Sequence, residues 1–165
     1  MPKTAMTIRP AAAEDLPRLQ AIRQAAFAPV FASFRDMLGD ALYELVQRRE
    51  DEAQAGLLAS LLAPGSGWEV RVAQAGGAIA GFVSIQLNVQ TQVGEIGLNA
   101  VHPDHAGQGI GTAMYEFALE RMKGAGMRAA TVSTGADASH APARRAYRKA
   151  GFDAEVPSVW MCRRL

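Results

Sequence analysis

A glycine-rich segment in the second half of the chain combines residue types that suit the binding of an anion. Gly107, Gly109 and Gly111 alternate with other residues and open into an amphipathic stretch, in which apolar residues recur at the spacing of one helical face. An apolar strand over residues 93–102 precedes them and ends at Pro103. Because the first amides of a helix lack partners and lie at the positive end of its dipole, this unit predicts a site for a phosphate or diphosphate.

Two common nucleotide-binding patterns fail on spacing. The dinucleotide fingerprint G-x-G-x-x-G, counted from Gly107, requires glycine where the chain has Thr112. The mononucleotide P-loop ends in a Gly-Lys pair, which occurs nowhere in the sequence. A nucleotide-phosphate binder is therefore the weakest of the functions considered for this loop.

Two longer motifs surround this loop and follow it. The first, Val101–Gly111, reads V-H-P-D-H-A-G-Q-G-I-G, and the second, His140–Phe152, reads H-A-P-A-R-R-A-Y-R-K-A-G-F. They resemble the V-x-P-x-x-[RQ]-x-x-G-x-G/A and N-x-x-A-x-x-x-Y-x-K-x-G-F motifs of the GCN5-related N-acetyltransferase (GNAT) family. Ala106 departs from the usual arginine or glutamine, and His140 departs from the usual asparagine. The order of elements resembles the family over the whole chain.

The resemblance implies that acetyl-CoA is the cofactor. In that family two parallel strands splay apart and the pantetheine arm lies between them, bonded to main-chain groups, while loop amides hold the pyrophosphate. The residues that the resemblance places at the cofactor are Asn99, Ala100, Val101, Ala106, Gly107, Gln108, Gly109, Ile110, Gly111, Thr112, His140, Ala143 and Tyr147. Since most of these contacts use the main chain, the alanine at position 106 should weaken binding without abolishing it.

Transfer of an acetyl group to an amine requires a base for the ammonium and an acid for the departing thiolate. Tyr147 matches the tyrosine of the second motif and is the candidate acid; packing against the sheet is the alternative. Glu95 lies six residues before Val101 and matches a glutamate that some members of the family use as a base. Alternation along the strand places it on the same face as Val101, where an apolar environment would desolvate it. A substrate anchor or an exposed strand residue is the alternative for Glu95.

Several other residues have more than one interpretation. Imidazole exchanges protons near neutral pH, so His140 is interpreted as a cofactor contact, a residue that only begins the helix, or a base. Aromatic residues at positions 27, 31 and 34 predict either a core loop or an apolar wall for the acceptor: Phe27, Phe31 and Phe34. The basic run over residues 144–149 indicates a solvated face, with contacts to the phosphates of CoA as the alternative. No metal site is predicted.

The predicted fold is a single α/β domain over residues 1–165, with a mixed, mainly antiparallel sheet and a central splayed parallel pair, as in GNAT-like acyltransferases. Strands are expected over residues 4–9, 68–75, 78–89, 93–102, 127–134 and, returning antiparallel, 156–163. Helices are expected over residues 13–27, 36–49, 51–63, 110–123 and 140–150. Periodicity does not decide whether 36–63 forms two helices or one bent helix.

Composition limits the partners of the chain. Seventeen basic and sixteen acidic residues give a net charge of +1, which indicates neither nucleic acid nor a membrane as a partner. The single cysteine and the absence of an apolar leader favour a cytoplasmic location. We therefore expect an acetyl-CoA-dependent N-acetyltransferase acting on a small-molecule or peptide amine. A CoA-binding sensor without turnover is the alternative, and a homodimer through the sheet edge or the C-terminal strand is compatible with the sequence.

Overall fold

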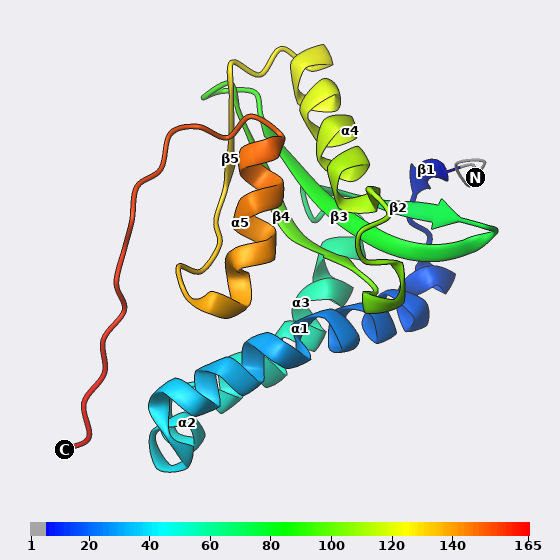
Figure 1. The fold of residues 1–165 in the computed structure, drawn as a ribbon. Coiled ribbons are helices and arrows are strands. Elements are labelled where there is room, and N and C mark those ends of the chain that lie inside the picture. The colour runs from blue at the N-terminus through cyan, green and yellow to red at the C-terminus, as the bar shows by residue number, and fades with distance from the viewer. Residues whose placement is uncertain (1–5) are drawn as a thin grey trace.

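Five strands form one sheet within the residues that the computed structural model describes, 6–165 (Figure 1). They are β1 (Met6–Pro10), β2 (Trp68–Ala75), β3 (Ala78–Asn88), β4 (Val93–Val101) and β5 (Ala129–Val132), in spatial order β1-β2-β3-β4-β5. Neighbours from β1 to β4 are antiparallel, and β4 and β5 are parallel. This confirms the predicted mixed sheet and its parallel pair. Thr4 and Ala5, the start of the first predicted strand, lie outside the described residues.

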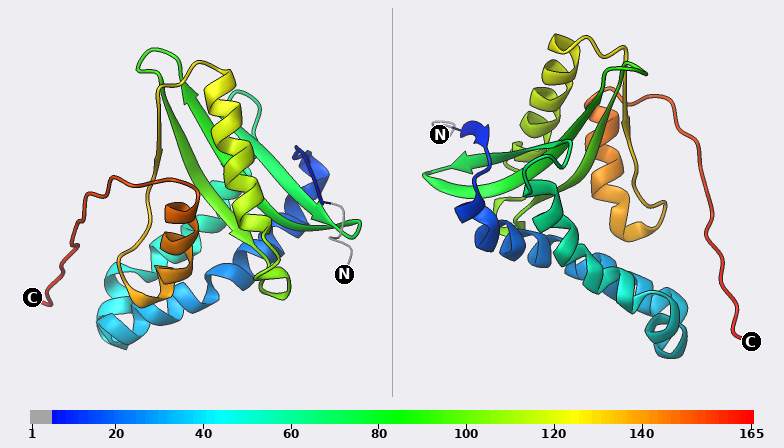
Figure 2. Two further views of the ribbon diagram at one scale, coloured as in Figure 1. Left: turned by 45° about the horizontal axis from the view of Figure 1, so that its top comes forward. Right: turned by 180° about the vertical axis from the view of Figure 1, so that it is seen from behind.

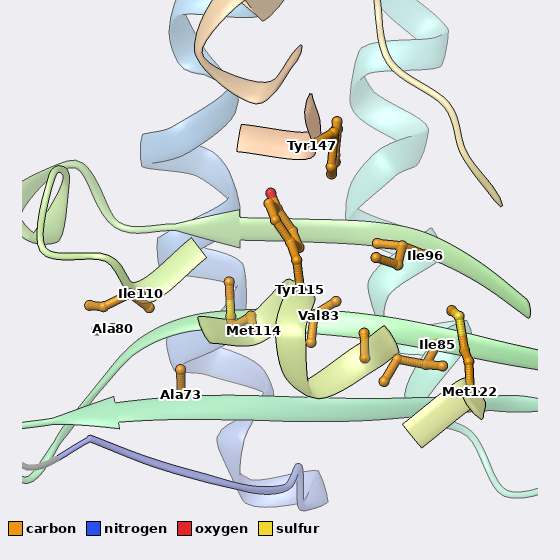
Figure 3. Packing of buried hydrophobic residues seen from close by; sticks show 11 residues of the cluster. Ala73, Ala80, Val83, Ile85, Ile96, Ile110, Met114, Tyr115, Met122 and Tyr147 are labelled. Carbon is orange, nitrogen blue, oxygen red and sulfur yellow. The ribbon is translucent and has the colours of Figure 1, made fainter. Parts of the chain in front are cut away.

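Helices cover both faces of this sheet (Figure 2). One face packs against α1 (Leu16–Leu38) and α3 (Arg48–Leu62), and its core includes Leu19, Leu58 and Phe82. The other face packs against α4 (Ile110–Gly124) and α5 (Ala141–Lys149), and its core includes Met114 and Tyr147 (Figure 3). Each fully buried large apolar side chain contributes about 1.5–3 kcal/mol, so the two cores fix both helix layers on the sheet. Within residues 6–165, no helix combines the length and apolar composition that a membrane crossing requires.

Helix α1 is longer than the sequence predicts, because it continues through Pro29 to Leu38. A loop was expected over residues 27–34, since an interior proline removes one hydrogen bond and crowds the preceding turn. That expectation is wrong. Four apolar residues recur at i, i+3, i+4 and i+7, the spacing of a helical stripe: Phe27, Val30, Phe31 and Phe34. Packing along this stripe outweighs the cost of the proline, whose own position is exposed.

The region after α1 forms two helices rather than one bent helix. Gly39, with a positive φ of 74° that favours glycine, ends α1 and precedes α2 (Asp40–Val46). Gln47 separates α2 from α3. The predicted hairpin between β2 and β3 is confirmed: Gly76 and Gly77 both have positive φ, at 61° and 83°, as the tightest hairpin turns require.

Residues 153–165 form neither helix nor strand and run away from the sheet (Figure 1). The predicted strand over residues 156–163 is therefore wrong. An exposed ion pair between Arg148 and Glu155, at 2.5 Å, connects the start of this segment to α5. Large apolar side chains along the segment remain exposed: Val156, Val159, Trp160, Met161 and Leu165. Without a following strand, the parallel pair lies at the edge of the sheet and not at its centre.

Candidate functional site

The glycine loop presents free backbone amides at the start of α4. Gly107 and Gly109 adopt left-handed conformations, with φ of 75° and 78°, which glycine reaches without a steric penalty. Among the backbone hydrogen bonds of the described residues, none is donated by an amide between positions 107 and 112. These donors lie at the positive end of the α4 dipole. Together they can hold an anion without any basic side chain.

The two parallel strands separate close to this loop. β4 pairs with β5 only from Val93 to Ile96, although it continues to Val101. Beyond Ile96, the edge of β4 that faces β5 has no strand partner among the described residues. The predicted splay is thus present, and its free edge exposes main-chain groups to which an extended amide-bearing ligand can bond as an added strand.

The side chain of Asn99, at this splay, joins two buried tyrosines. Its Nδ2 donates to the Tyr147 hydroxyl and to the Gly97 carbonyl, both at 2.9 Å, and its Oδ1 accepts from the Tyr115 hydroxyl at 2.8 Å. A carbonyl only accepts, so Gly97 determines which end of the amide is nitrogen. Because Asn99 donates to Tyr147, the phenol does not use its own proton in this bond.

Tyr115 supports this arrangement and was not singled out from the sequence. Burial raises its pKa far above the ordinary value, and the neighbouring phenol of Tyr147 raises it further. The two rings lie with their centroids 4.8 Å apart (Figure 3). Tyr115 therefore stays protonated and acts as a fixed donor to Asn99. The sequence offered one signal for Tyr115: it lies just over one turn into α4, the helix that follows the strand carrying Asn99.

Glu95 does not share a face with Val101, contrary to the expectation from simple alternation. Between Ile96 and Asn99, three steps along β4 correspond to two along β3, which is a β-bulge. The extra residue lets Ile96 and Asn99 point to the same face, so Glu95 points to the other. Its side chain is exposed, and the desolvation expected for it is absent.

His140 forms a close pair with Asp137, which the sequence analysis missed. The Nδ1 atom of His140 lies 2.5 Å from Oδ1 of Asp137, and the two side chains are 17% and 14% exposed. Burial pushes the pKa of Asp137 up, but hydrogen bonds from Ser139 and His140 outweigh this effect and hold it at about 2. The carboxylate is therefore charged at neutral pH. An acidic residue three positions before a histidine at a helix start was the signal for this pair.

A cavity of about 380 Å³ opens beside His140, between α1 and α3. The three phenylalanines of the predicted acceptor wall all line it: Phe27, Phe31 and Phe34. The ring of Phe34 lies 6.1 Å from the imidazole of His140. Glu50, Asp51 and Gln54 of α3 add polar groups that the sequence analysis did not include. Because α1 continues to Leu38, one helix carries all three phenylalanines to the side of His140.

The remaining candidates have structural contacts of their own. Arg144 donates to the carbonyls of Gly135 and Asp137, at 2.6 and 2.7 Å, and so braces the segment that carries the Asp137–His140 pair. His102 accepts a hydrogen bond from the amide of Asp104 before the glycine loop. The basic run on α5 is therefore divided between a brace and exposed residues.

Comparisons with known proteins agree with this geometry. The sequence profile of the Acetyltransferase (GNAT) family matches residues 31–152. A comparison with curated protein sequences finds no match. Similar folds occur in a GNAT-family acetyltransferase from Desulfovibrio desulfuricans, with 20% identity, coverage of 92% of this chain and 87% of that one, and a TM-score of 0.70.

Two further solved structures carry ligands. A GNAT acetyltransferase from Brucella melitensis, in complex with acetyl-CoA, is 23% identical over 92% of this chain and 84% of that one, with a TM-score of 0.58. An aminoglycoside acetyltransferase from an uncultured soil sample, in complex with sisomicin, is 20% identical over 97% and 96%, with a TM-score of 0.59. At these identities the likeness shows the fold, whereas the profile match covers most of the chain. The free amides, the splayed strands and this match identify the chain as a member of the GNAT family of acetyltransferases, whose cosubstrate is acetyl-CoA.

Proposed function

We propose that this chain transfers the acetyl group of acetyl-CoA to a primary amine of a small molecule or of an amino terminus. The observation that carries the proposal is the phenol of Tyr147, held at the splay of β4 and β5 by a hydrogen bond from Asn99 that does not use the phenol's own proton. A proton donor is needed there only if a basic leaving group forms beside it, and a thiolate is such a group.

The residues present fit acetyl-CoA in two independent ways. The six amides at positions 107–112 lack partners and suit a diphosphate. The free edge of β4 from Asn99 to Val101 suits the amide groups of a pantetheine arm. Ala106 contributes only its main chain, so the loop binds through backbone groups alone. Of the two residues that the resemblance adds at the start of α5, Ala143 is the proposed further contact.

The chemistry requires two proton transfers. When bound, acetyl-CoA supplies a thioester whose C–S bond breaks as the bond between its carbonyl carbon and the acceptor nitrogen forms. Tyr147 donates its proton to the sulfur and is reprotonated from solvent. An alkylammonium keeps its proton at neutral pH, so a base on the chain must remove one proton before the nitrogen can attack. The nitrogen loses two protons in all: the base removes the first before attack, and the second leaves to solvent after the C–N bond has formed. Since sulfur gains one proton from Tyr147, which solvent replaces, the net reaction releases one proton.

We place the acceptor in the aromatic cavity beside α1. Phe27, Phe31 and Phe34 provide an apolar wall, and carboxylates from α3 provide negative charge for a protonated amine. One protein of similar fold carries an aminoglycoside, sisomicin. The cavity here is more aromatic in its lining than a site for a sugar polycation would require, which favours an amine with an apolar body.

The test is an amine panel assayed for thiol release from acetyl-CoA, with 2-phenylethylamine, spermidine and a dipeptide as probes. Tyr147→Phe should lower kcat by about 10²-fold or more with little change in acetyl-CoA affinity. Glu95→Gln should leave turnover within a factor of about two. Binding of CoA without thiol release from any probe would favour a sensor function instead.

A further inference from the structure

The pair formed by Asp137 and His140 is built more rigidly than a surface contact requires. Ser139 donates to Asp137 through both its hydroxyl and its amide, the latter at 3.1 Å. Ser33 of α1 reaches the same carboxylate at 3.3 Å, and Arg144 holds the backbone around it. Ser33 and Ser139, from two separate elements, therefore meet at one carboxylate whose hydrogen-bonded partner is a histidine.

The orientation of the histidine follows from this partner. A carboxylate that is charged can only accept, so Nδ1 of His140 must donate the proton to Asp137. The Nε2 atom of a neutral ring then keeps its lone pair and can accept a proton. This is the arrangement in which a carboxylate fixes the tautomer of a catalytic imidazole.

The cavity that His140 lines is suited to a cation. The described residues around it include two carboxylates, Glu50 and Asp51, and neither lysine nor arginine. Asp51 is buried and accepts from Tyr43 and from Gln47. Glu50 is exposed and is thus free to approach a ligand.

Gln54 gives a second, independent indication of a donor ligand. Its side-chain oxygen is buried and has no hydrogen-bond partner, although the residue lines the cavity. A buried carbonyl oxygen without a donor is costly, and an ammonium group would supply the missing donor. An anion or a neutral ligand without N–H or O–H groups would leave it unsatisfied.

His140 is also placed where a base is needed. It lies seven residues before Tyr147, so the two side chains project from the same face of α5, about 10 Å apart along the helix. The acid faces the splay of the sheet and the histidine faces the acceptor cavity. Glu95 is exposed on the opposite face of β4 and lines no part of this cavity.

We infer that His140, held by Asp137, is the general base that deprotonates the acceptor ammonium, and that the cavity binds organic amines with an apolar or aromatic body. The inference rests on the proposed function. Nε2 of His140 takes one proton from the ammonium and passes it to solvent, and the freed lone pair on nitrogen forms the new bond to carbon. Asp137 is a positioning residue, because it acts through the imidazole.

Four charged groups lie around His140. Asp137 contacts the ring, Glu50 and Asp51 approach from α3, and Arg144 holds the loop beneath it. Three of these four groups are carboxylates. A base accepts a proton only when it is unprotonated, so we expect kcat/KM to rise with pH through one ionisation and to lose that limb in His140→Asn.

The first experiment needs no acceptor. Nitrogen NMR of the histidine ring should show the tautomer with the proton on Nδ1 in the wild-type chain, and a mixture of tautomers in Asp137→Asn. Asp153→Asn, which changes an exposed carboxylate on the C-terminal segment, is the matched control and should leave the spectrum unchanged. A proton on Nε2 at neutral pH in the wild-type chain would overturn the inference whether or not the chain is an acetyltransferase.

The second experiment uses 2-phenylethylamine and acetyl-CoA. His140→Asn, which introduces the residue usual in the family motif, should lower kcat/KM by 10²-fold or more and leave acetyl-CoA affinity within threefold. Gln54→Leu should raise KM for the amine about tenfold at unchanged kcat. If His140→Asn kept the full wild-type turnover and the same pH profile, His140 would not be the general base. If the wild-type chain turned over none of the amines, the result would count against the proposed function. The NMR measurement of the His140 tautomer would still test the pairing of His140 with Asp137.

Discussion

Replacing Gly135 with alanine would push Asp137 and His140 apart without substituting either residue. A Cβ at position 135 would lie 2.6 Å from Oδ1 of Asp137 and nearer still to Nδ1 of His140. Ordinary contact with a Cβ begins at 3.4 Å, so the carboxylate oxygen has to move by 3.4 − 2.6 = 0.8 Å. The backbone of Gly135 is not left-handed, so alanine adds no strain of its own.

The expected loss follows from that displacement. The contact between Asp137 and His140 is 2.5 Å, and lengthening it by most of an ångström removes a strong hydrogen bond. Overpacking should cost about 1–3 kcal/mol of folding stability. A base without its orienting partner should lower kcat/KM by about 10²-fold, the lower end of the range for general acid–base catalysis.

The assay is thiol release with 2-phenylethylamine at several pH values, alongside acetyl-CoA binding and urea unfolding. Gly124→Ala is the matched control, because a Cβ at the end of α4 meets no atom within 4 Å. It should keep full activity at equal or slightly higher stability. Full activity in a folded Gly135→Ala enzyme, with the wild-type pH profile, would show that the tight pair does not serve catalysis.

Three further predictions concern the acid, the loop and stability in acid. Asn99→Leu should lower the free energy of unfolding, measured in urea, by about 2 kcal/mol, since it deletes the hydrogen bonds to Tyr147 and Tyr115. A stability equal to wild type would show that this network does not stabilise the fold. Gly109→Ala should raise the Kd for acetyl-CoA at least fivefold, because a left-handed alanine costs about 1 kcal/mol and the strain falls on the amides of the loop. An unchanged Kd, measured by calorimetry, would argue against a diphosphate at this loop. The lowered pKa of Asp137, about 2, means that its contribution of about 2 kcal/mol is present above pH 4 and is lost as the pH falls towards 2. Asp137→Asn should flatten the stability profile over that interval, and a profile identical to wild type would mean that the carboxylate is not stabilised by folding.

Most of the architecture was predictable because it depends on local patterns. The glycine pair at 76–77, the apolar strand from Val93 and the helix from Ile110 each carry a signal within a few residues, and all three are confirmed. The stripe from Phe27 to Phe34 carried an equally clear helical spacing. The proline at position 29 obscured this signal. The cost of an interior proline can be read from the sequence, whereas the packing that offsets it is visible only in the structure.

The C-terminal segment shows the opposite failure. Its apolar residues predict a strand, but strand pairing depends on where the chain goes after α5, and residues 153–165 form no strand and leave these side chains exposed. Similarly, the position of Glu95 depended on an unbroken alternation along β4. A single bulge reverses that alternation, and nothing in the residues from 95 to 101 announces it.

By itself the sequence determined the family resemblance, the glycine loop, the splayed parallel pair and the candidate acid Tyr147, because each depends on motifs or periods that are contiguous in the chain. Only the tertiary structure decided which groups meet. It brought Asp137 against His140, placed His140 beside phenylalanines more than a hundred positions earlier, and left Glu95 exposed on the far face. Contacts between distant residues depend on the packing of whole elements, and no local pattern of residues records them.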